Sequence, residues 1–244
     1  MTWLLEVDVE RKAFAGRQVL DRIEIGIKAG EVVTLVGPSG CGKSTLLRIV
    51  AGLDRDYRGS LQLQGQALLG LNRNVGFVFQ EPRLFPWLSV AENVGFSAGA
   101  AGATDGRTRE LVAAVGLADF ASALPKALSG GMMQRAAIAR GLFTQPRLLL
   151  LDEPFSAVDA FTRMKLQDLL LALAAQRGTT LLSVTHDIDE AVYLSDRVLV
   201  MSSGPGMISA EARITVPRPR DRRDPRLAEF KAEVLTHLYD VHAI

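Results

Sequence analysis

Apolar residues recur along the chain in two patterns, one typical of β-strands and one typical of helices. Positions 4–9 and 23–28 alternate apolar residues with charged or small ones, as half-buried strands do. Positions 31–36 and 147–151 are runs rich in β-branched residues or leucine, which suits buried strands of a parallel sheet. Further strands are predicted at 60–64, 74–79, 179–185 and 197–201, and helices at 44–52, 161–176 and 188–194.

Strands and helices that alternate at this spacing predict an α/β core built on a parallel sheet. A mostly helical part is expected up to about residue 144, interrupted at 98–107 by small and polar residues that indicate a flexible link. From residue 217 the sequence PRPRDRRDP predicts an extended, solvated stretch. A final helix should dock through one apolar face, formed by Leu227, Phe230, Val234, Leu235 and Leu238.

Composition narrows the class of protein. The 28 Lys and Arg residues nearly balance the 27 Asp and Glu residues of this 244-residue chain, so no overall field favours nucleic acid. A single cysteine excludes an internal disulfide and fits a reducing compartment. The acidic N-terminus lacks the pattern of a signal peptide, and no apolar run approaches the ~18–20 residues that span a bilayer. The expected location is the cytosol or a membrane face.

A glycine-rich loop at residues 37–44, the phosphate loop below, lies between a predicted buried strand and an amphipathic helix. A chance glycine turn is the alternative, but it does not account for this setting. Backbone N–H groups and the helix N-terminus would bind phosphates, Lys43 would neutralise the β- and γ-phosphates, and Ser44 would ligate Mg²⁺. The predicted nucleotide-binding residues here are Gly37, Pro38, Ser39, Gly40, Cys41, Gly42, Lys43, Ser44 and Thr45.

Two carboxylates follow the leucine-rich strand at 147–151. Adjacent residues at the end of a strand point in different directions, so Asp152 and Glu153 can do different work. Asp152 would hold Mg²⁺, directly or through water, and Glu153 would accept a proton from the attacking water. An acid pair after a strand is, taken alone, more often the start of a loop. The phosphate loop in the same chain favours the catalytic interpretation.

The segment LSGGMMQR at 128–135, the signature segment below, places a hydroxyl and two glycines at the start of an apolar helix. Such a helix terminus can bind an anion. Its residues Ser129, Gly130 and Gly131 could equally be an ordinary serine N-cap followed by glycines.

Together these segments resemble the ATP-binding cassette family, and the resemblance covers nearly the whole chain. The phosphate loop, Gln80 after a strand, the signature segment, LLLLDEP at 148–154, SAVD at 156–159 and His186 after a strand follow the family's order and approximate spacing. The resemblance implies a P-loop NTPase fold of the RecA-like type, with a parallel-sheet core, an antiparallel β subdomain and a helical signature subdomain at about 90–144. It also implies an ATPase domain over 1–216 and a C-terminal extension with a docked helix over 217–244.

The resemblance also implies roles for single residues. Phe14 would stack on adenine, although a core phenylalanine is an equal alternative. Gln80 would touch Mg²⁺ and the attacking water, so the metal ligands would be Ser44, Gln80 and Asp152. His186 would contact the γ-phosphate as a third catalytic group beside Glu153 and Gln80. The signature residues Ser129, Gly130 and Gly131 would close over the ATP of a second copy in a head-to-tail dimer, and Asp159 would link the two sites.

Segments 79–87, 89–93, 152–163 and 217–225 are similar to the nitrate/sulfonate/taurine importer group. This resemblance implies membrane-embedded permease partners, an indirect solute-binding partner, no nucleic acid, and a peripheral place on the cytoplasmic face of the inner membrane. A soluble regulatory or assembly ATPase without a permease is the alternative. A permease groove beside Gln80 could be formed by Leu84, Phe85, Trp87 and Leu88, for which ordinary core packing is the other interpretation.

Overall fold

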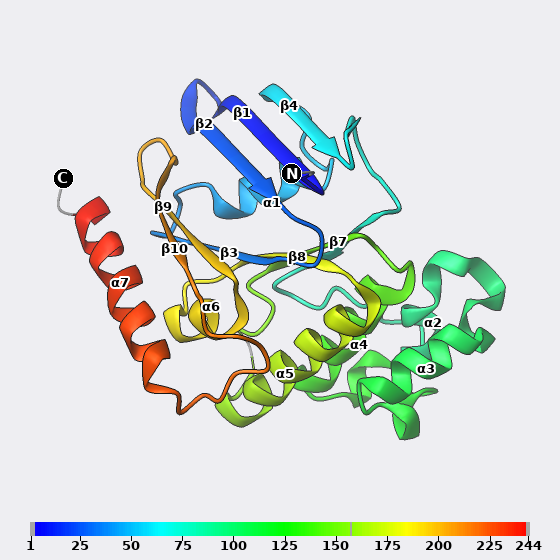
Figure 1. Cartoon of the computed structure of the whole chain (residues 1–244). Coiled ribbons are helices and arrows are strands. Elements are labelled where there is room, and N and C mark those ends of the chain that lie inside the picture. The colour runs from blue at the N-terminus through cyan, green and yellow to red at the C-terminus, as the bar shows by residue number, and fades with distance from the viewer. Residues whose placement is uncertain (1–2, 157, 243–244) are drawn as a thin grey trace. The chain divides into compact units, whose positions relative to one another are not determined.

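The computed structural model describes residues 3–156 and 158–242. The chain divides into two compact units, one formed by residues 1–72 and 180–244 and the other by residues 73–179. Figure 1 shows the elements of both units. Among the described residues, no helix combines the length and the apolar composition that crossing a membrane requires.

The first unit contains an antiparallel sheet of order β2-β1-β4-β5. The alternation at its start confirms the predicted strands, because the inward positions of β1 and β2 are buried and the outward ones exposed. Both strands are longer than the pattern indicated, because hydrogen bonding between them extends the end of β1 to Phe14 and the start of β2 to Arg17. The bounds are β1 Leu5–Phe14, β2 Arg17–Ile27, β4 Arg58–Leu63 and β5 Gln66–Ala67.

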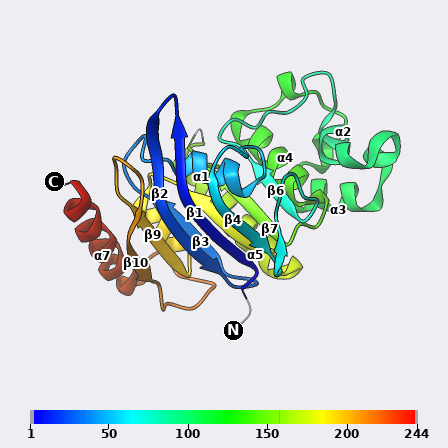
Figure 2. The same cartoon turned by 90° about the horizontal axis from the view of Figure 1, so that it is seen from above.

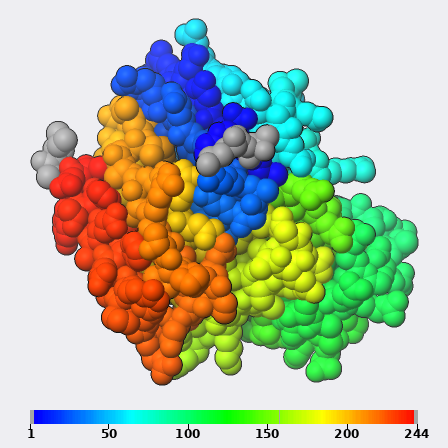
Figure 3. Space-filling view, in the orientation of Figure 1, coloured from blue at the N-terminus to red at the C-terminus, as the bar shows by residue number. Residues whose placement is uncertain are grey.

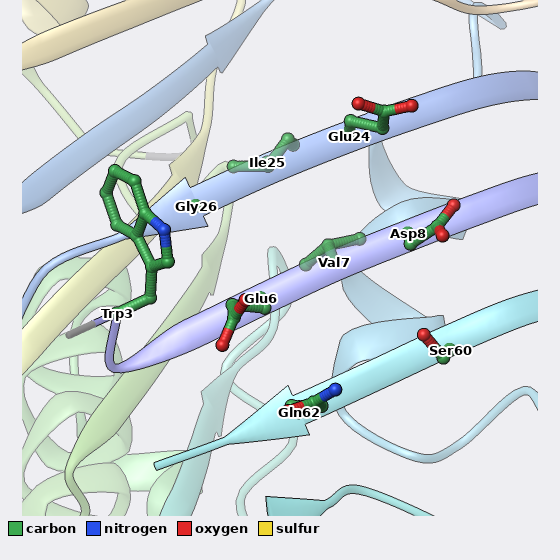
Figure 4. A pocket seen from close by; sticks show the side chains of 9 residues that line it. All are labelled: Trp3, Glu6, Val7, Asp8, Glu24, Ile25, Gly26, Ser60 and Gln62. Atoms are coloured by element: carbon green, nitrogen blue, oxygen red, sulfur yellow. The ribbon is translucent and has the colours of Figure 1, made fainter. Parts of the chain in front are cut away.

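The outer face of this sheet carries a hollow of about 480 Å³ lined by carboxylates (Figure 4). Asp8 stands directly opposite Glu24 on the neighbouring strand, a pairing of like charges that destabilises a sheet slightly. Trp3 lies over Gly26, where an added Cβ would come within 2.8 Å of the indole ring. None of the predicted nucleotide-binding residues lines this hollow.

The same unit also holds the strands β9-β3-β8, which pair in parallel as the buried runs predicted. Strand β10 adds an antiparallel edge to β9, which the sequence analysis did not predict. Apolar and polar residues alternate only in part along β10, so its sequence gave little indication of a strand. Its hydrogen bonds to β9 make it one. The bounds are β3 Val32–Val36, α1 Lys43–Val50, β8 Thr180–Val184, α6 Ile188–Leu194, β9 Arg197–Met201 and β10 Ile208–Arg213.

The last helix, α7 (Pro225–His242), packs along α6, β9 and β10. Figures 2 and 3 show it in red beside the orange segment that contains β10. Leu227 and Val234 are buried on its inner face, which confirms the predicted docking. The stretch before it was predicted to be solvated, and this is wrong at Arg220, which is only 6% exposed. Backbone carbonyl oxygens surround its guanidinium and replace water as acceptors.

The second unit pairs two parallel strands, β6 (Val75–Val78) and β7 (Leu148–Asp152), and carries most of the helices. The flexible link predicted at 98–107 is wrong in part, because residues 96–104 form 3-10 turns with a kink at Gly99. Gly95 and Gly102 approach so closely that a Cβ on either would collide with the other's backbone. The α-helices of this unit are α2 Val90–Val94, α3 Gly106–Ala114, α4 Gly130–Phe143 and α5 Ala160–Arg177.

Candidate active site

The phosphate loop connects β3 to α1 in the first unit, as predicted. Gly37 has φ 153° and Gly42 has φ 102°, in the region that favours glycine. A Cβ at Gly42 would come within 2.5 Å of Leu20, and one at Gly37 within 2.5 Å of the Met201 carbonyl oxygen. Both glycines are therefore required by the backbone conformation and by close packing.

Lys43 lies buried within this loop. Its Nζ donates hydrogen bonds of 2.8 Å to the carbonyl oxygens of Gly37 and Pro38 and lies 3.7 Å from Cys41 Sγ. The ammonium therefore holds the loop closed around itself. An incoming phosphate would replace those carbonyl oxygens as acceptors, and charge-assisted bonds to phosphate are stronger than bonds to neutral carbonyls. Ser44 and Thr45 follow in the first turn of α1, and Ser39 and Gly40 lie exposed at the tip of the loop.

Phe14 ends β1 and is half exposed, with 49% of its surface accessible. This exposure contradicts the alternative of a core phenylalanine. The Nζ of Lys12 lies 4.3 Å from the ring centroid, and the same ammonium donates to Asp54 Oδ1 at 2.8 Å and to the carbonyl oxygen of Asp56 at 2.6 Å. A buried cation thus orients the ring by a cation–π contact.

In the second unit, the register of β6 and β7 places Val78 beside Leu151. Gln80 and Glu153 each follow two residues later, at the same edge of the pair. Gln80 Nε2 donates to Glu153 Oε2 at 3.3 Å, so the structure brings these two predicted catalytic residues together. Asp152 is buried at the end of β7, whereas Glu153 turns out of the strand with φ 46°. The strand end therefore separates the two carboxylates, as predicted.

The signature segment begins α4. Ser129 is its N-cap and accepts a hydrogen bond from the backbone N–H of Met132, which is the ordinary capping role. Gly131 packs against the start of α5, where an added Cβ would lie 2.9 Å from Thr162 Cγ2. The N–H groups of a first helical turn have no partners within the helix, so capping by Ser129 leaves anion-binding donors at this terminus.

Asp159 is exposed and caps α5. Its carboxylate accepts a hydrogen bond from the backbone N–H of Thr162 at 3.0 Å, and this bond holds the pKa of Asp159 below its usual value. Ala157, within the SAVD motif, lies outside the described residues. The acidic residue predicted to link two sites therefore also has a structural role within its own chain.

His186 follows β8 in the first unit and is exposed. Asp187 accepts from the backbone N–H of Glu190 and so caps α6, which places His186 just before a helix. The backbone N–H of Asp187 donates to Thr185 Oγ1 at 3.1 Å. His186 is thus held in a short connection between a buried strand and a capped helix.

Phe85, Trp87 and Phe96 form an aromatic group after Gln80, in which Phe85 is half-buried and the other two are exposed. Trp87 has 70% of its surface accessible and Phe96 has 52%, and the ring of Phe85 lies 5.7 Å from the first and 4.4 Å from the second. Core packing therefore does not apply to Trp87. The buried Asn93 holds the loop, because its side chain accepts from the backbone N–H of Phe85 and donates to the carbonyl oxygens of Phe85, Leu88 and Ser89.

Sequence reasoning missed three residues that support these sites. Lys12 was not distinguished from the outward charges of its strand, and Asn93 was noted only within a motif. Arg220 was assigned to a solvated stretch. A buried lysine or arginine carries no local sequence signal, because its burial depends on acceptors distant in the chain.

Comparison with known proteins identifies the family. The ABC transporter family model matches residues 20–156, which is more than half of the chain. The chain belongs to the ABC transporter family. Its matched region starts in β2 and includes the phosphate loop, Gln80, the signature segment and Glu153.

Relatives in this family match the chain over almost its full length. The chain is 61% identical to the aliphatic sulfonates import ATP-binding protein SsuB 1 of Pseudomonas syringae pv. syringae, over 99% of the chain and 98% of the relative. It is 55% identical to the SsuB 1 protein of Xanthomonas axonopodis pv. citri, over 98% and 97%.

Solved structures of ABC proteins share the fold. One is the dimeric ATP-binding cassette MJ0796 in a post-hydrolysis state bound to ADP and Pi, with a TM-score of 0.74, 32% identity, and coverage of 87% of this chain and 100% of that one. Another is cbiO1 of Clostridium perfringens, part of the cbiONQ transporter complex, with a TM-score of 0.79, 28% identity, and coverage of 88% and 90%. As an ABC protein, the chain is an ATPase with the predicted P-loop NTPase fold.

Proposed function

We propose that this ABC ATPase powers the import of an aliphatic sulfonate. The observation that carries the proposal is the 61% identity, over nearly both full chains, to a protein named for aliphatic sulfonate import. The alternative of a soluble regulatory ATPase finds no support among the relatives, since those compared are named as import proteins. The chain would work as a peripheral subunit on the cytoplasmic face of the inner membrane, with two permease subunits and, indirectly, a solute-binding protein.

The solute is tested in cells, because the ATPase subunit itself does not touch it. Deleting the gene for this chain should abolish uptake of a labelled alkanesulfonate and leave nitrate uptake unchanged. Restoring the wild-type chain should restore uptake, whereas a Glu153→Gln chain should not. Lost nitrate uptake with intact sulfonate uptake would overturn the assignment of the solute.

Each ATP is proposed to lie between the phosphate loop of one copy and the signature segment of another. The dimeric MJ0796 cassette, of the same fold, supports two copies as the working unit. Ser44, Gln80 and Asp152 offer hydroxyl, amide and carboxylate oxygens, the donor types that Mg²⁺ prefers, so these residues fit the ion. Bound there, Mg²⁺ would neutralise charge that develops on the phosphates.

Within each site the residues have separate tasks. Lys43 binds the phosphates, Gln80 orients Glu153 through the 3.3 Å hydrogen bond and also positions water, and Glu153 accepts the proton of that water. His186 contacts the γ-phosphate. Closure of the two copies would move the permease, and hydrolysis would reset it.

Replacing Phe14 tests adenine stacking. Phe14→Ala should weaken ATP binding by up to about tenfold, since a stacked aromatic pair contributes about 0.5–1.5 kcal/mol. Phe14→Trp, which keeps a flat ring beside Lys12, should bind ATP as the wild type does. The measurement is isothermal titration with ATP, and equal affinities for all three proteins would exclude stacking.

The exposed aromatic group is proposed to receive the permease. Trp87→Ala should leave basal ATP hydrolysis unchanged and remove the stimulation by permease and loaded binding protein, because a central aromatic anchor contributes about 2 kcal/mol or more, roughly a 30-fold change in affinity. Leu69→Ala, at another exposed apolar residue (84%), is the control and should keep full stimulation. Retained stimulation in the Trp87 variant would exclude this surface.

A further inference from the structure

The C-terminal segment, residues 217–242, holds the short helix α6 through four cationic side chains. Arg218 Nη2 binds Asp196 Oδ2 at 2.6 Å, just after the helix. The guanidinium of Arg222 lies 3.6 Å from the centroid of the Tyr193 ring. Lys231 Nζ binds both carboxylate oxygens of Asp189, in the first turn of the helix, at 2.7 Å. The fourth is Arg220, at the centre.

Arg220 binds the C-terminal end of α6. Its Nη1 donates to the carbonyl oxygens of Val192 and Tyr193 at 3.0 and 2.7 Å, and its Nε donates to the carbonyl oxygen of Val216 at 2.8 Å. Burial lowers the pKa of Arg220 to about 10, so the side chain is still charged at neutral pH. A cation at this end of a helix complements both the helix dipole and the carbonyl groups that lack helical partners.

Helix α6 needs such support because it has only seven residues. Helices shorter than about 12 residues are marginal on their own, so tertiary contacts determine where they lie. His186 precedes the Asp187 N-cap of this helix directly. Any shift of α6 along its axis therefore moves His186, since one residue joins them.

We propose that the C-terminal segment is a clamp that fixes α6 and thereby positions His186, with Arg220 as the central positioning residue. This inference rests on the proposed contact of His186 with the γ-phosphate. The contacts at both ends of the helix favour this role over simple stabilisation of the fold. A stabilising segment needs apolar burial alone, which α7 already supplies through Leu227 and Val234.

A double-mutant cycle tests the clamp. Arg220→Gln should lower the single-turnover rate of ATP hydrolysis roughly tenfold and leave ATP affinity unchanged, since small misplacements of a reacting group cost up to about 100-fold. In a His186→Ala background, Arg220→Gln should have no further effect, because the residue that it positions is absent. Arg226→Gln, which removes an exposed guanidinium that binds Asp224 in the same segment, is the matched control and should retain the wild-type rate.

The outcomes separate the possible failures. If His186→Ala leaves the rate unchanged, the proposed role of His186 is wrong. If His186→Ala lowers the rate and adding Arg220→Gln to that variant lowers it further, Arg220 does not act through His186, and the clamp is overturned. The same holds if Arg220→Gln alone lowers both the rate and the stoichiometry of ATP binding, because Arg220 then acts on folding.

The exposed ion pair between Lys231 and Asp189 allows a second test of the clamp, in which no buried side chain is replaced. Lys231→Glu should slow hydrolysis, and adding Asp189→Lys should restore the rate by reversing the ion pair. The clamp would be overturned if the reversed pair failed to restore the rate of hydrolysis and the Arg220→Gln protein also kept the wild-type rate. Neither end of α6 would then affect hydrolysis.

Discussion

Glu153→Gln should lower kcat for ATP hydrolysis by roughly 10²–10⁴-fold, the usual contribution of a general base. Glutamine has nearly the shape of glutamate, so it can keep the turn at φ 46° and remain beside Gln80, but it cannot accept a proton. ATP binding should therefore persist. Because hydrolysis is what opens the proposed dimer, the variant should accumulate as an ATP-bound dimer, measured by size-exclusion chromatography with and without ATP.

Glu81→Gln is the matched control for this experiment. It makes the same change at the residue after Gln80, where the carboxylate is exposed. Its turnover and its monomer–dimer behaviour should equal those of the wild type. A Glu153→Gln protein that turns over at the wild-type rate would refute the assignment of the general base.

Two inactive variants should restore each other's activity when mixed. Lys43→Met removes the buried cation of the phosphate loop, and Ser129→Arg places bulk and positive charge at the N-terminus of α4, where the helix dipole opposes a cation. Each variant alone should have almost no ATPase activity. In a mixed dimer one site combines Lys43 of one copy with Ser129 of the other, so an equal mixture should regain about a quarter of the competent sites.

The measurement is steady-state phosphate release at constant total protein. Each unmixed variant at the same concentration is the control. Activity of the mixture that equals the average of the two variants would show that Lys43 and Ser129 act within one chain. That result would exclude the head-to-tail arrangement while leaving ATP hydrolysis itself established.

Much of the site could be predicted from the sequence because its parts are local. Gly37 and Gly42 stand at positions where φ is positive and space is absent, so their spacing alone indicated the loop. Asp152 is the last residue of β7 and Glu153 leaves the strand with φ 46°, so the end of the strand separates the two carboxylates. Helix α6 and strand β9 begin and end at the predicted residues, since their apolar patterns are short and clearly bounded.

Other features could not be predicted, because they depend on partners far away in the chain. Trp87 is exposed, although its size and its apolar neighbours are as typical of a buried core as of a surface. The hydrogen bonds of Asn93 maintain the loop that exposes it. The segment 217–223 has the composition of a solvated stretch, yet Arg220 within it is buried. Its guanidinium donates hydrogen bonds to carbonyl oxygens of α6 in place of water. A charge pattern indicates that cations are present, but it does not indicate which acceptors they find.

The sequence by itself determined the family, the phosphate loop, the carboxylate pair and most strands and helices of the core, since these follow from short-range spacing and backbone preference. Only the tertiary structure decided that Gln80 meets Glu153, that Lys12 supports Phe14 and that the C-terminal segment holds α6. The first and the last of these contacts, and the hydrogen bonds that hold Lys12 to Asp54 and Asp56, join residues separated by tens of positions. Their pairing is decided when packing brings donors and acceptors together, which no local pattern records.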